Sequence, residues 1–105
     1  MSFPLSGLSA PATFKEVWLA ENLPAIVSLY RELHQNPELS VAEKQTSGRL
    51  ANELRNATAE VEQEIGGYGV VGLLKNGPGK VLMLRADMDA LPVVEQTGLD
   101  YASQV

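Results

Sequence analysis

The chain has 105 residues, 45% of them hydrophobic, and a formal net charge of −5 at pH 7. Its length suits one folded domain or part of one, and its hydrophobic content argues against a disordered segment. The acidic balance argues against nucleic acid and anionic membranes as partners, because both require a basic face. The absence of cysteine excludes disulfides and thiolate sites, and together with an amino-terminus unlike a secretory signal it predicts a cytoplasmic protein.

The residue pattern of the amino-terminal third predicts an irregular segment followed by two helices. Residues 1–12 are rich in Ser, Pro and Gly and are expected to be irregular. Thr13 and Glu16 form a capping-box pattern, which predicts a short helix over residues 14–21. We expect Pro24 to separate this helix from a second one that begins near Leu23, because proline breaks a helix interior but is tolerated in a first turn.

The second predicted helix has the clearest period in the sequence. Its apolar positions recur on one face of a 3.6-residue helix, and the pair Asn36 and Pro37 then stops it. This face consists of Leu23, Ile26, Val27, Tyr30, Leu33 and His34. The positions of Phe14, Trp18 and Tyr30 favour core packing over a ligand site.

A third helix and a set of strands follow. Ser40 and Glu43 form a second capping-box pattern, which predicts a helix ending near residue 56 with a narrow buried stripe. The stripe consists of Ala42, Thr46, Leu50 and Leu54. Residues 58–65 then alternate acidic and less polar side chains, which predicts an edge strand with a solvated acidic face.

Two turn signals, at Gly66–Gly67 and at Asn76–Gly79, delimit two further predicted strands over residues 70–75 and 81–86. The short links between the strands predict antiparallel neighbours. The last strand is apolar on both faces through residue 84, so it is expected to be central.

The residues of greatest chemical interest follow that last strand. Asp87 and Asp89 would lie just past its carboxyl end, where open α/β sheets place their sites, and would share one side if the extended geometry continued. One of them could orient a metal-bound imidazole. The alternative is that they cap the turn before Leu91 and Pro92, since aspartate bonds its own backbone in turns. Arg85 is expected to pair with one of these aspartates or another carboxylate, or to reach solvent.

The remaining polar features do not assemble a site. His34 is the only histidine, and its place at the end of a helix favours a core-edge residue stabilised by the helix dipole over a ligand. The run Gly66–Gly69 is similar to a phosphate loop, but it lies between two predicted strands and opens no helix. With one histidine, no cysteine and acidic residues scattered mainly along polar faces, the sequence shows no complete set of about three ligands for a catalytic zinc-type site.

Several runs, in the right order, resemble the opening of M20-type metallopeptidases. They are residues 29–40 (LYRELHQNPELS), Gly69–Gly72 with Asn76–Gly79, and residues 84–92 (LRADMDALP) with Glu95–Gly98. The resemblance covers residues 23–104. It is closest to the amidohydrolase branch that includes hippurate hydrolase, N-acyl-amino-acid deacylases and the plant auxin-conjugate hydrolases.

The resemblance implies a hydrolase with two metal ions, zinc or manganese, that cleaves the amide bond of small N-acyl amino acids. In this branch the metal ligands belong to a Cys-Gly-His-Asp motif and to later Glu and His residues, which would fall after Val105. Other M20 branches have a histidine where this chain has Arg85, so only Asp87 carries over, in a supporting catalytic role. We therefore expect these 105 residues alone to contain no metal ligand, to bind no metal tightly and to be inactive.

The expected fold class is α/β, with amino-terminal helices packed on the first strands of a mixed sheet. Residues 13–105 would form the amino-terminal part of an incomplete M20 catalytic domain. The alternative is a non-catalytic interaction module, or a truncated remnant, that self-associates through an exposed strand edge.

Overall fold

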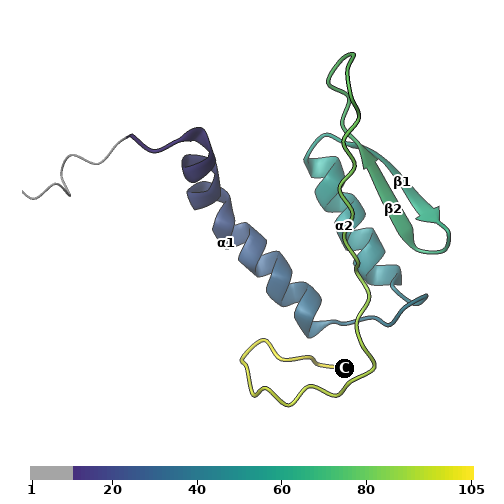
Figure 1. Ribbon diagram of the computed structural model, residues 1–105. Helices are drawn as coiled ribbons and strands as arrows, with labels where there is room; N and C mark the ends of the chain where they lie inside the picture. The colour runs from purple at the N-terminus through teal and green to yellow at the C-terminus, as the bar shows by residue number, and fades with distance from the viewer. Residues whose placement is uncertain (1–10) are drawn as a thin grey trace, which may run out of the picture. The chain divides into compact units, whose positions relative to one another are not determined.

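The computed structural model describes residues 11–105, so the predicted irregular segment lies outside the described residues except at positions 11 and 12. The elements follow the order α1 (Phe14–Gln35), α2 (Lys44–Asn56), β1 (Glu60–Ile65) and β2 (Gly69–Leu73) (Figure 1). The chain divides into two compact units, residues 1–32 and 33–105. The last turn of α1 and all later elements belong to the second unit.

Helix α1 begins as the capping-box pattern predicts. The Thr13 N–H donates to Glu16 Oε2 over 2.7 Å, and the Glu16 N–H donates to Thr13 Oγ1 over 3.3 Å. The predicted separation into two helices is wrong, because α1 continues through Pro24 to Gln35. Figure 1 shows the ribbon of α1 bending after its first turns, which is how a helix accommodates the bulk and missing N–H of a proline.

The apolar face of α1 is exposed, so the predicted core position of its aromatic residues is wrong. No residue of this helix is buried, and Phe14, Trp18 and Tyr30 are 83%, 48% and 54% exposed. The described part of the first unit contains α1 up to Glu32 and the residues just before this helix. That unit therefore has no second described element against which the face could pack.

Helix α2 receives its amino-terminal cap from outside the helix. Glu38 Oε2 accepts the N–H of Gln45 over 3.1 Å, and Glu38 Oε1 accepts the N–H of Thr46. These donors lack partners within the helix, because the first four N–H groups of any α-helix have none. A carboxylate also interacts favourably with the positive end of the helix dipole.

The predicted capping box of Ser40 and Glu43 does not form. Glu43 is the residue before the first turn of α2, and its side chain makes no capping bond. Its carboxylate instead accepts the Val41 N–H over 3.0 Å. Val41 has a left-handed φ of 63°, so the chain turns between the two residues and the reciprocal bonds of a box are lost.

Strands β1 and β2 form an antiparallel hairpin, as their short link predicts. Compared with the predicted strands, β1 begins two residues later, at Glu60, and β2 ends two residues earlier, at Leu73. Glu60 pairs with Leu73 and Ile65 pairs with Gly69. The solvated acidic face of β1 is confirmed, because its glutamates are all exposed. The run Gly66–Gly69 forms the turn of this hairpin and begins β2, so it does not open a helix as a phosphate loop does.

The buried core lies between α2 and the hairpin. Ala51 is the only hydrophobic residue among those described that is fully buried, and Thr46 is buried on the same helix. A Cβ atom on Gly72 would lie 3.1 Å from the methyl carbons of Leu54, so glycine permits the close approach of β2 to α2. The predicted stripe of α2 is confirmed at Thr46, whereas Ala42 precedes the helix and is exposed.

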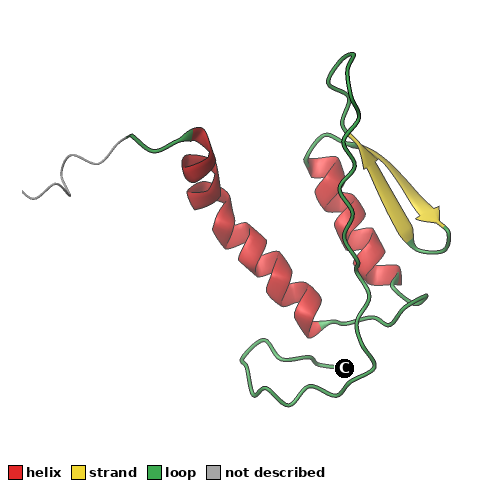
Figure 2. Cartoon of the chain, viewed as in Figure 1, coloured by secondary structure: helices red, strands yellow, loops and turns green. Residues whose placement is uncertain are grey.

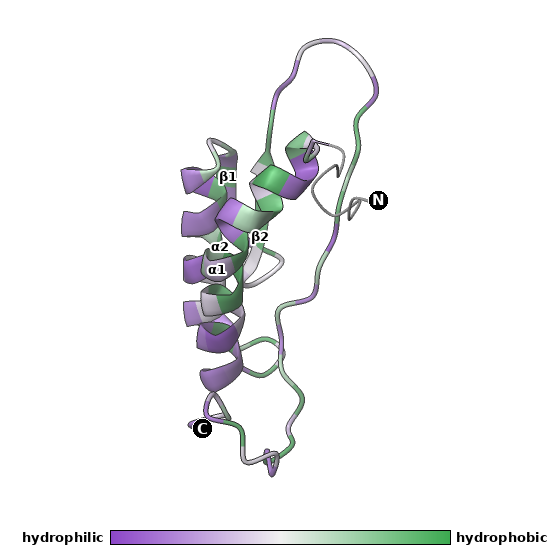
Figure 3. Ribbon diagram, turned by 90° about the vertical axis from the view of Figure 1, so that its left-hand side faces the viewer, coloured by the Kyte–Doolittle hydropathy of each residue, from purple (hydrophilic) through white to green (hydrophobic). Residues whose placement is uncertain are grey.

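The predicted third strand over residues 81–86 is wrong. These residues form neither helix nor strand (Figure 2), and Val81–Leu84 is exposed along its whole length. Figure 3 shows hydrophobic residues along the extended chain that follows β2. A central strand requires a hydrogen-bonded neighbour on each side, and in the described part of the chain β1 and β2 pair only with each other.

The α/β class is confirmed, but the sheet is a two-stranded antiparallel hairpin and not a mixed sheet. Helix α2 packs on both of its strands. None of the described helices is long and apolar enough to cross a membrane.

Candidate functional site

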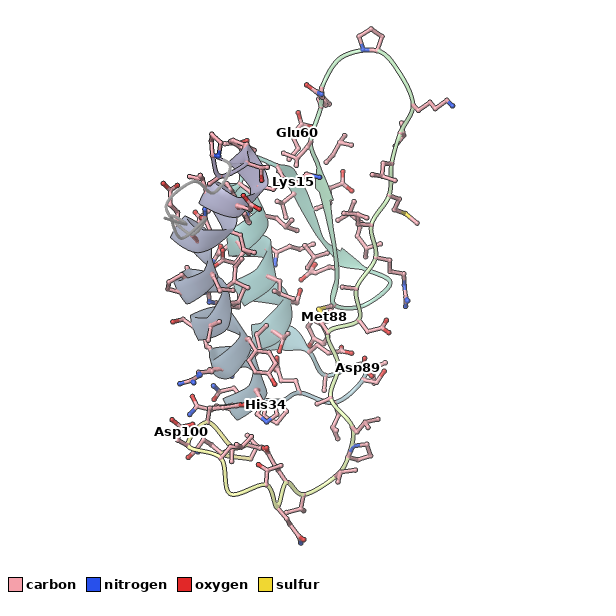
Figure 4. The ribbon with its side chains drawn as sticks, turned by 60° about the vertical axis from the view of Figure 1, so that its left-hand side comes forward. Lys15, His34, Glu60, Met88, Asp89 and Asp100 are labelled. Atoms are coloured by element: carbon pink, nitrogen blue, oxygen red, sulfur yellow. The ribbon has the colours of Figure 1, made fainter. Side chains whose placement is uncertain are left out.

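Two of the predicted site residues form an ion pair. Arg85 Nη2 lies 2.7 Å from Asp87 Oδ1, and both side chains are exposed, so one of the predicted partners of Arg85 is confirmed. Exposure alternates along the following residues, with Asp87 and Asp89 exposed and Met88 half-buried. The two carboxylates therefore share the outer side of an extended chain, with Asp89 on the stretch that follows β2 (Figure 4).

The turn after these carboxylates is closed by the main chain. The Val93 N–H donates to the carbonyl oxygen of Leu91 over 2.8 Å. Within residues 11–105, neither Asp87 nor Asp89 accepts a backbone N–H of this turn, so the turn-capping alternative is not realised.

Ala90 joins this segment to the loop that precedes α2. Its N–H donates to the carbonyl oxygen of Glu38 over 2.7 Å, and Ala90 forms an isolated parallel bridge with Leu39. These contacts bring together the runs 29–40 and 84–92, which are far apart in the sequence.

A polar cluster forms around His34 and Glu95. His34 Nε2 lies 2.8 Å from Glu95 Oε1, and the two side chains are 33% and 13% exposed. Glu95 also accepts the Thr97 hydroxyl over 2.7 Å and the N–H of Ser103. The ring of Tyr101 meets the imidazole edge to face, with ring centroids 5.4 Å apart. The predicted half-buried place of His34 on the last helical turn is confirmed (Figure 4).

Glu95 in this cluster and Glu38 at the start of α2 are both held in the ionised form by the hydrogen bonds that they accept. The hydrogen bond from His34, followed by those from the Ser103 N–H and the Thr97 hydroxyl, lowers the pKa of Glu95 to about 2. Burial raises the pKa of Glu38, but hydrogen bonds from residues 44–46 outweigh it, so the pKa is lowered. Both carboxylates are therefore fixed acceptors near neutral pH and are poorly suited to proton transfer.

The described residues do not fit a divalent metal site. No group of three or more His, Cys, Asp or Glu side chains in residues 11–105 could hold a metal ion. The imidazole of His34 is bonded to Glu95, and Asp87 is paired with the Arg85 guanidinium, a cation beside the carboxylate that a metal would need. A metal would require further ligands.

Sequence reasoning missed the roles of Glu38 and Glu95. Glu38 lies six residues before the first residue of α2, outside the positions that capping patterns include. Glu95 meets His34 across a separation of 61 residues, for which no local pattern exists. The one available signal was that both glutamates fall within runs that carry the family resemblance.

Comparison with curated proteins identifies related hydrolases. The chain is 46% identical over 82 residues to thermostable carboxypeptidase 2 of Saccharolobus solfataricus and 49% identical over 74 residues to hippurate hydrolase of Campylobacter jejuni. It is 37% identical over 84 residues to N-acetyldiaminopimelate deacetylase of Oenococcus oeni. The alignments cover 76%, 70% and 75% of this chain but only 21%, 19% and 22% of these relatives.

The chain therefore spans about a fifth of the length of the curated relatives it matches. No family model matches the chain, and no solved structure matches it. The names of the relatives agree with the family that runs 29–40 and 84–92 resemble. The chain is homologous to a segment of the M20-type amidohydrolases and peptidases.

Proposed function

We propose that these 105 residues are part of a metal-dependent hydrolase that cleaves the amide bond of small N-acyl amino acids. The observation that carries the proposal is the 49% identity with a hippurate hydrolase, whose name describes hydrolysis of an N-acyl amino acid. The 46% identity with a carboxypeptidase, whose name describes peptide hydrolysis, agrees with amide cleavage. Residues 13–105 would form the amino-terminal part of the catalytic domain. The cysteine-free sequence supports a cytoplasmic location.

Within this proposal, Asp87 supports a zinc or manganese site whose ligands lie outside these 105 residues. Its carboxylate is exposed on an extended chain, and its ion-pair partner among the described residues is Arg85. His34 and Glu95 are bonded to each other. We therefore expect the 105-residue chain to bind neither metal tightly and to hydrolyse no amide.

A metal titration tests this expectation directly. Zinc and manganese are titrated into the 105-residue chain by isothermal titration calorimetry, and release of glycine from hippurate is followed with each metal present. We expect no stoichiometric binding at micromolar concentrations and no glycine release. Stoichiometric tight binding together with hydrolysis would contradict the proposal that the ligands lie elsewhere.

A chimera tests the family activity. The aligned 74 residues of the Campylobacter jejuni hippurate hydrolase are replaced by those of this chain. We expect hippurate hydrolysis to persist and Asp87→Asn to lower kcat roughly 10- to 100-fold, as removal of a residue that supports metal ligands does. Glu62→Gln, the same chemical change on the exposed face of β1, is the control. A folded chimera without hydrolysis would refute the proposed function.

The exposed run Val81–Leu84 favours one alternative, the interaction module that pairs with a second copy of the chain. Four consecutive apolar side chains are exposed there, with Val81 and Leu84 each 88% exposed. An extended apolar segment without strand neighbours is a template for pairing. Sedimentation velocity should then show a dimer that Leu82→Lys abolishes and Val94→Lys, an exposed change outside the run, does not. A monomer at all concentrations would exclude this alternative.

A further inference from the structure

We infer that Glu38, His34 and Glu95 are positioning residues that clamp the segment carrying Asp87 at two points. The first point is the hydrogen bond from the Ala90 N–H to the Glu38 carbonyl, and the second is the contact between His34 and Glu95. Both points lie in the second compact unit.

The first point is anchored because Glu38 is fixed by its own side chain. Its two carboxylate oxygens accept the N–H groups of Gln45 and Thr46 in the first turn of α2. The same residue offers its carbonyl oxygen to the Ala90 N–H at 2.7 Å, and the neighbouring Leu39 forms the parallel bridge with Ala90. The cap of α2 and the attachment of Ala90 are thus made by one residue.

The second point is anchored because Glu95 collects several donors. Its carboxylate meets His34 on the last turn of α1, the Thr97 hydroxyl and the Ser103 N–H. A further backbone bond runs from the Gln104 N–H to the Gln35 carbonyl over 2.9 Å, so the chain after Glu95 returns to the same helical turn. The side chain of Glu95 is only 13% exposed, which protects these bonds from water.

The two points hold Asp87 because nothing else in its neighbourhood forms regular structure. Residues 74–89 contain no helix or strand. Asp87 precedes Ala90 by three residues, a span of about 10 Å in an extended chain. Where the carboxylate lies therefore depends on how Ala90 is held, and the second point, five residues further on, fixes the direction in which the chain leaves Ala90. The importance of Asp87 rests on the proposed function, whereas the clamp itself rests on geometry.

Amide hydrogen exchange on the 105-residue chain tests the clamp. In His34→Ala we expect the Ser103 amide to exchange at least tenfold faster, and the Ala90 amide, which touches neither His34 nor Glu95, to follow it. His34→Gln, whose side-chain amide can still donate to Glu95, should restore much of the protection at both amides. The amides of β1 and β2 should be unchanged in both variants.

Three results would overturn the inference. They are faster exchange at Ser103 with Ala90 unchanged, equal acceleration throughout the hairpin, and no rescue by His34→Gln. Because His34→Ala could unfold the unit, Thr97→Val provides a milder variant that removes one donor to Glu95. It should accelerate Ser103 and Ala90 together by a smaller factor, and unchanged exchange at Ala90 would again contradict the clamp.

The hippurate hydrolase chimera separates this inference from the proposed function. If the clamp positions Asp87 for catalysis, His34→Ala should lower kcat by roughly 10- to 100-fold with little change in KM, because misplacement of a supporting group acts on the chemical step. An inactive chimera would refute the proposed function and leave the exchange result on the clamp standing. An active chimera whose kcat is unaffected by His34→Ala would refute the catalytic part of the inference.

Discussion

Replacement of Glu38 by glutamine should destabilise the second unit by about 1–2 kcal/mol at neutral pH, in the range measured for loss of helix caps. Glutamine has nearly the size of glutamate, but only one of its two terminal atoms is an acceptor. One of the bonds to the N–H groups of Gln45 and Thr46 is therefore lost, and the donor it leaves lies in the first turn of α2.

The magnitude combines two effects. A typical hydrogen bond contributes about 0.5–1.5 kcal/mol net, and the charge of a carboxylate at a helix amino-terminus adds about 0.3–1 kcal/mol. Glu38 is half-buried, so neither effect should reach the values of fully buried groups. The cap stabilises α2, whose packing on both strands makes the core, so the loss should appear in the unfolding of the whole unit.

Urea unfolding followed by circular dichroism at pH 7 measures the difference, with Glu62→Gln on the exposed face of β1 as the matched control. The control should lie within about 0.5 kcal/mol of the parent chain. Because the pKa of Glu38 is lowered in the folded state, its carboxylate stabilises the fold above the unfolded pKa of 4.5, and this contribution is lost as the pH falls through the lowered value. Equal stability of the two variants at pH 7, or a difference that persists unchanged in strong acid, would refute the reasoning.

Three further predictions follow from the backbone and from Glu95. Gly69→Ala should destabilise the hairpin, because the new Cβ would lie 2.3 Å from the Ile65 carbonyl oxygen. Gly48→Ala has open space at the Cβ and should stabilise α2 by about 1 kcal/mol. Urea midpoints that move in the same direction for both variants would contradict this pair of predictions. Val41→Asn should stabilise the chain by about 1 kcal/mol, since asparagine tolerates the φ of 63° better than a β-branched residue, and Val81→Asn, at an equally exposed site, should not. The stability contributed by Glu95 should be complete above its unfolded pKa of 4.5 and be lost as the pH falls towards about 2, and Glu95→Gln should flatten this part of the pH profile of unfolding. A profile identical to that of the parent chain would show that Glu95 is not held ionised.

The local elements were predictable because their signals lie within a few residues. The reciprocal bonds of Thr13 and Glu16 start α1 as their spacing indicates, and the paired glycines at 66 and 67 turn β1 into β2. The ion pair of Arg85 with Asp87 is also local, at a spacing of two residues. In each case the partners are neighbours in the sequence, so spacing and residue type determine the contact.

The predictions that were wrong concern features that neighbouring residues alone do not decide. Pro24 stays inside α1 because proline can be accommodated by a bend, which the local breaking rule does not include. Residues 81–86 have the composition of a central strand, but a strand exists only with neighbours, and the described chain provides none for them. The aromatic residues of α1 have a core pattern, but burial requires a second surface.

By itself, the sequence determined the family, the hairpin, the start of α1 and the place of the two aspartates on one side of an extended chain. Only the tertiary structure decided that Glu38 caps α2, that Ala90 returns to Glu38, and that His34 meets Glu95 from 61 residues away. The physical reason is that secondary-structure patterns record a residue's preference for local geometry. Hydrogen bonds between distant residues depend on where the folded backbone brings them together.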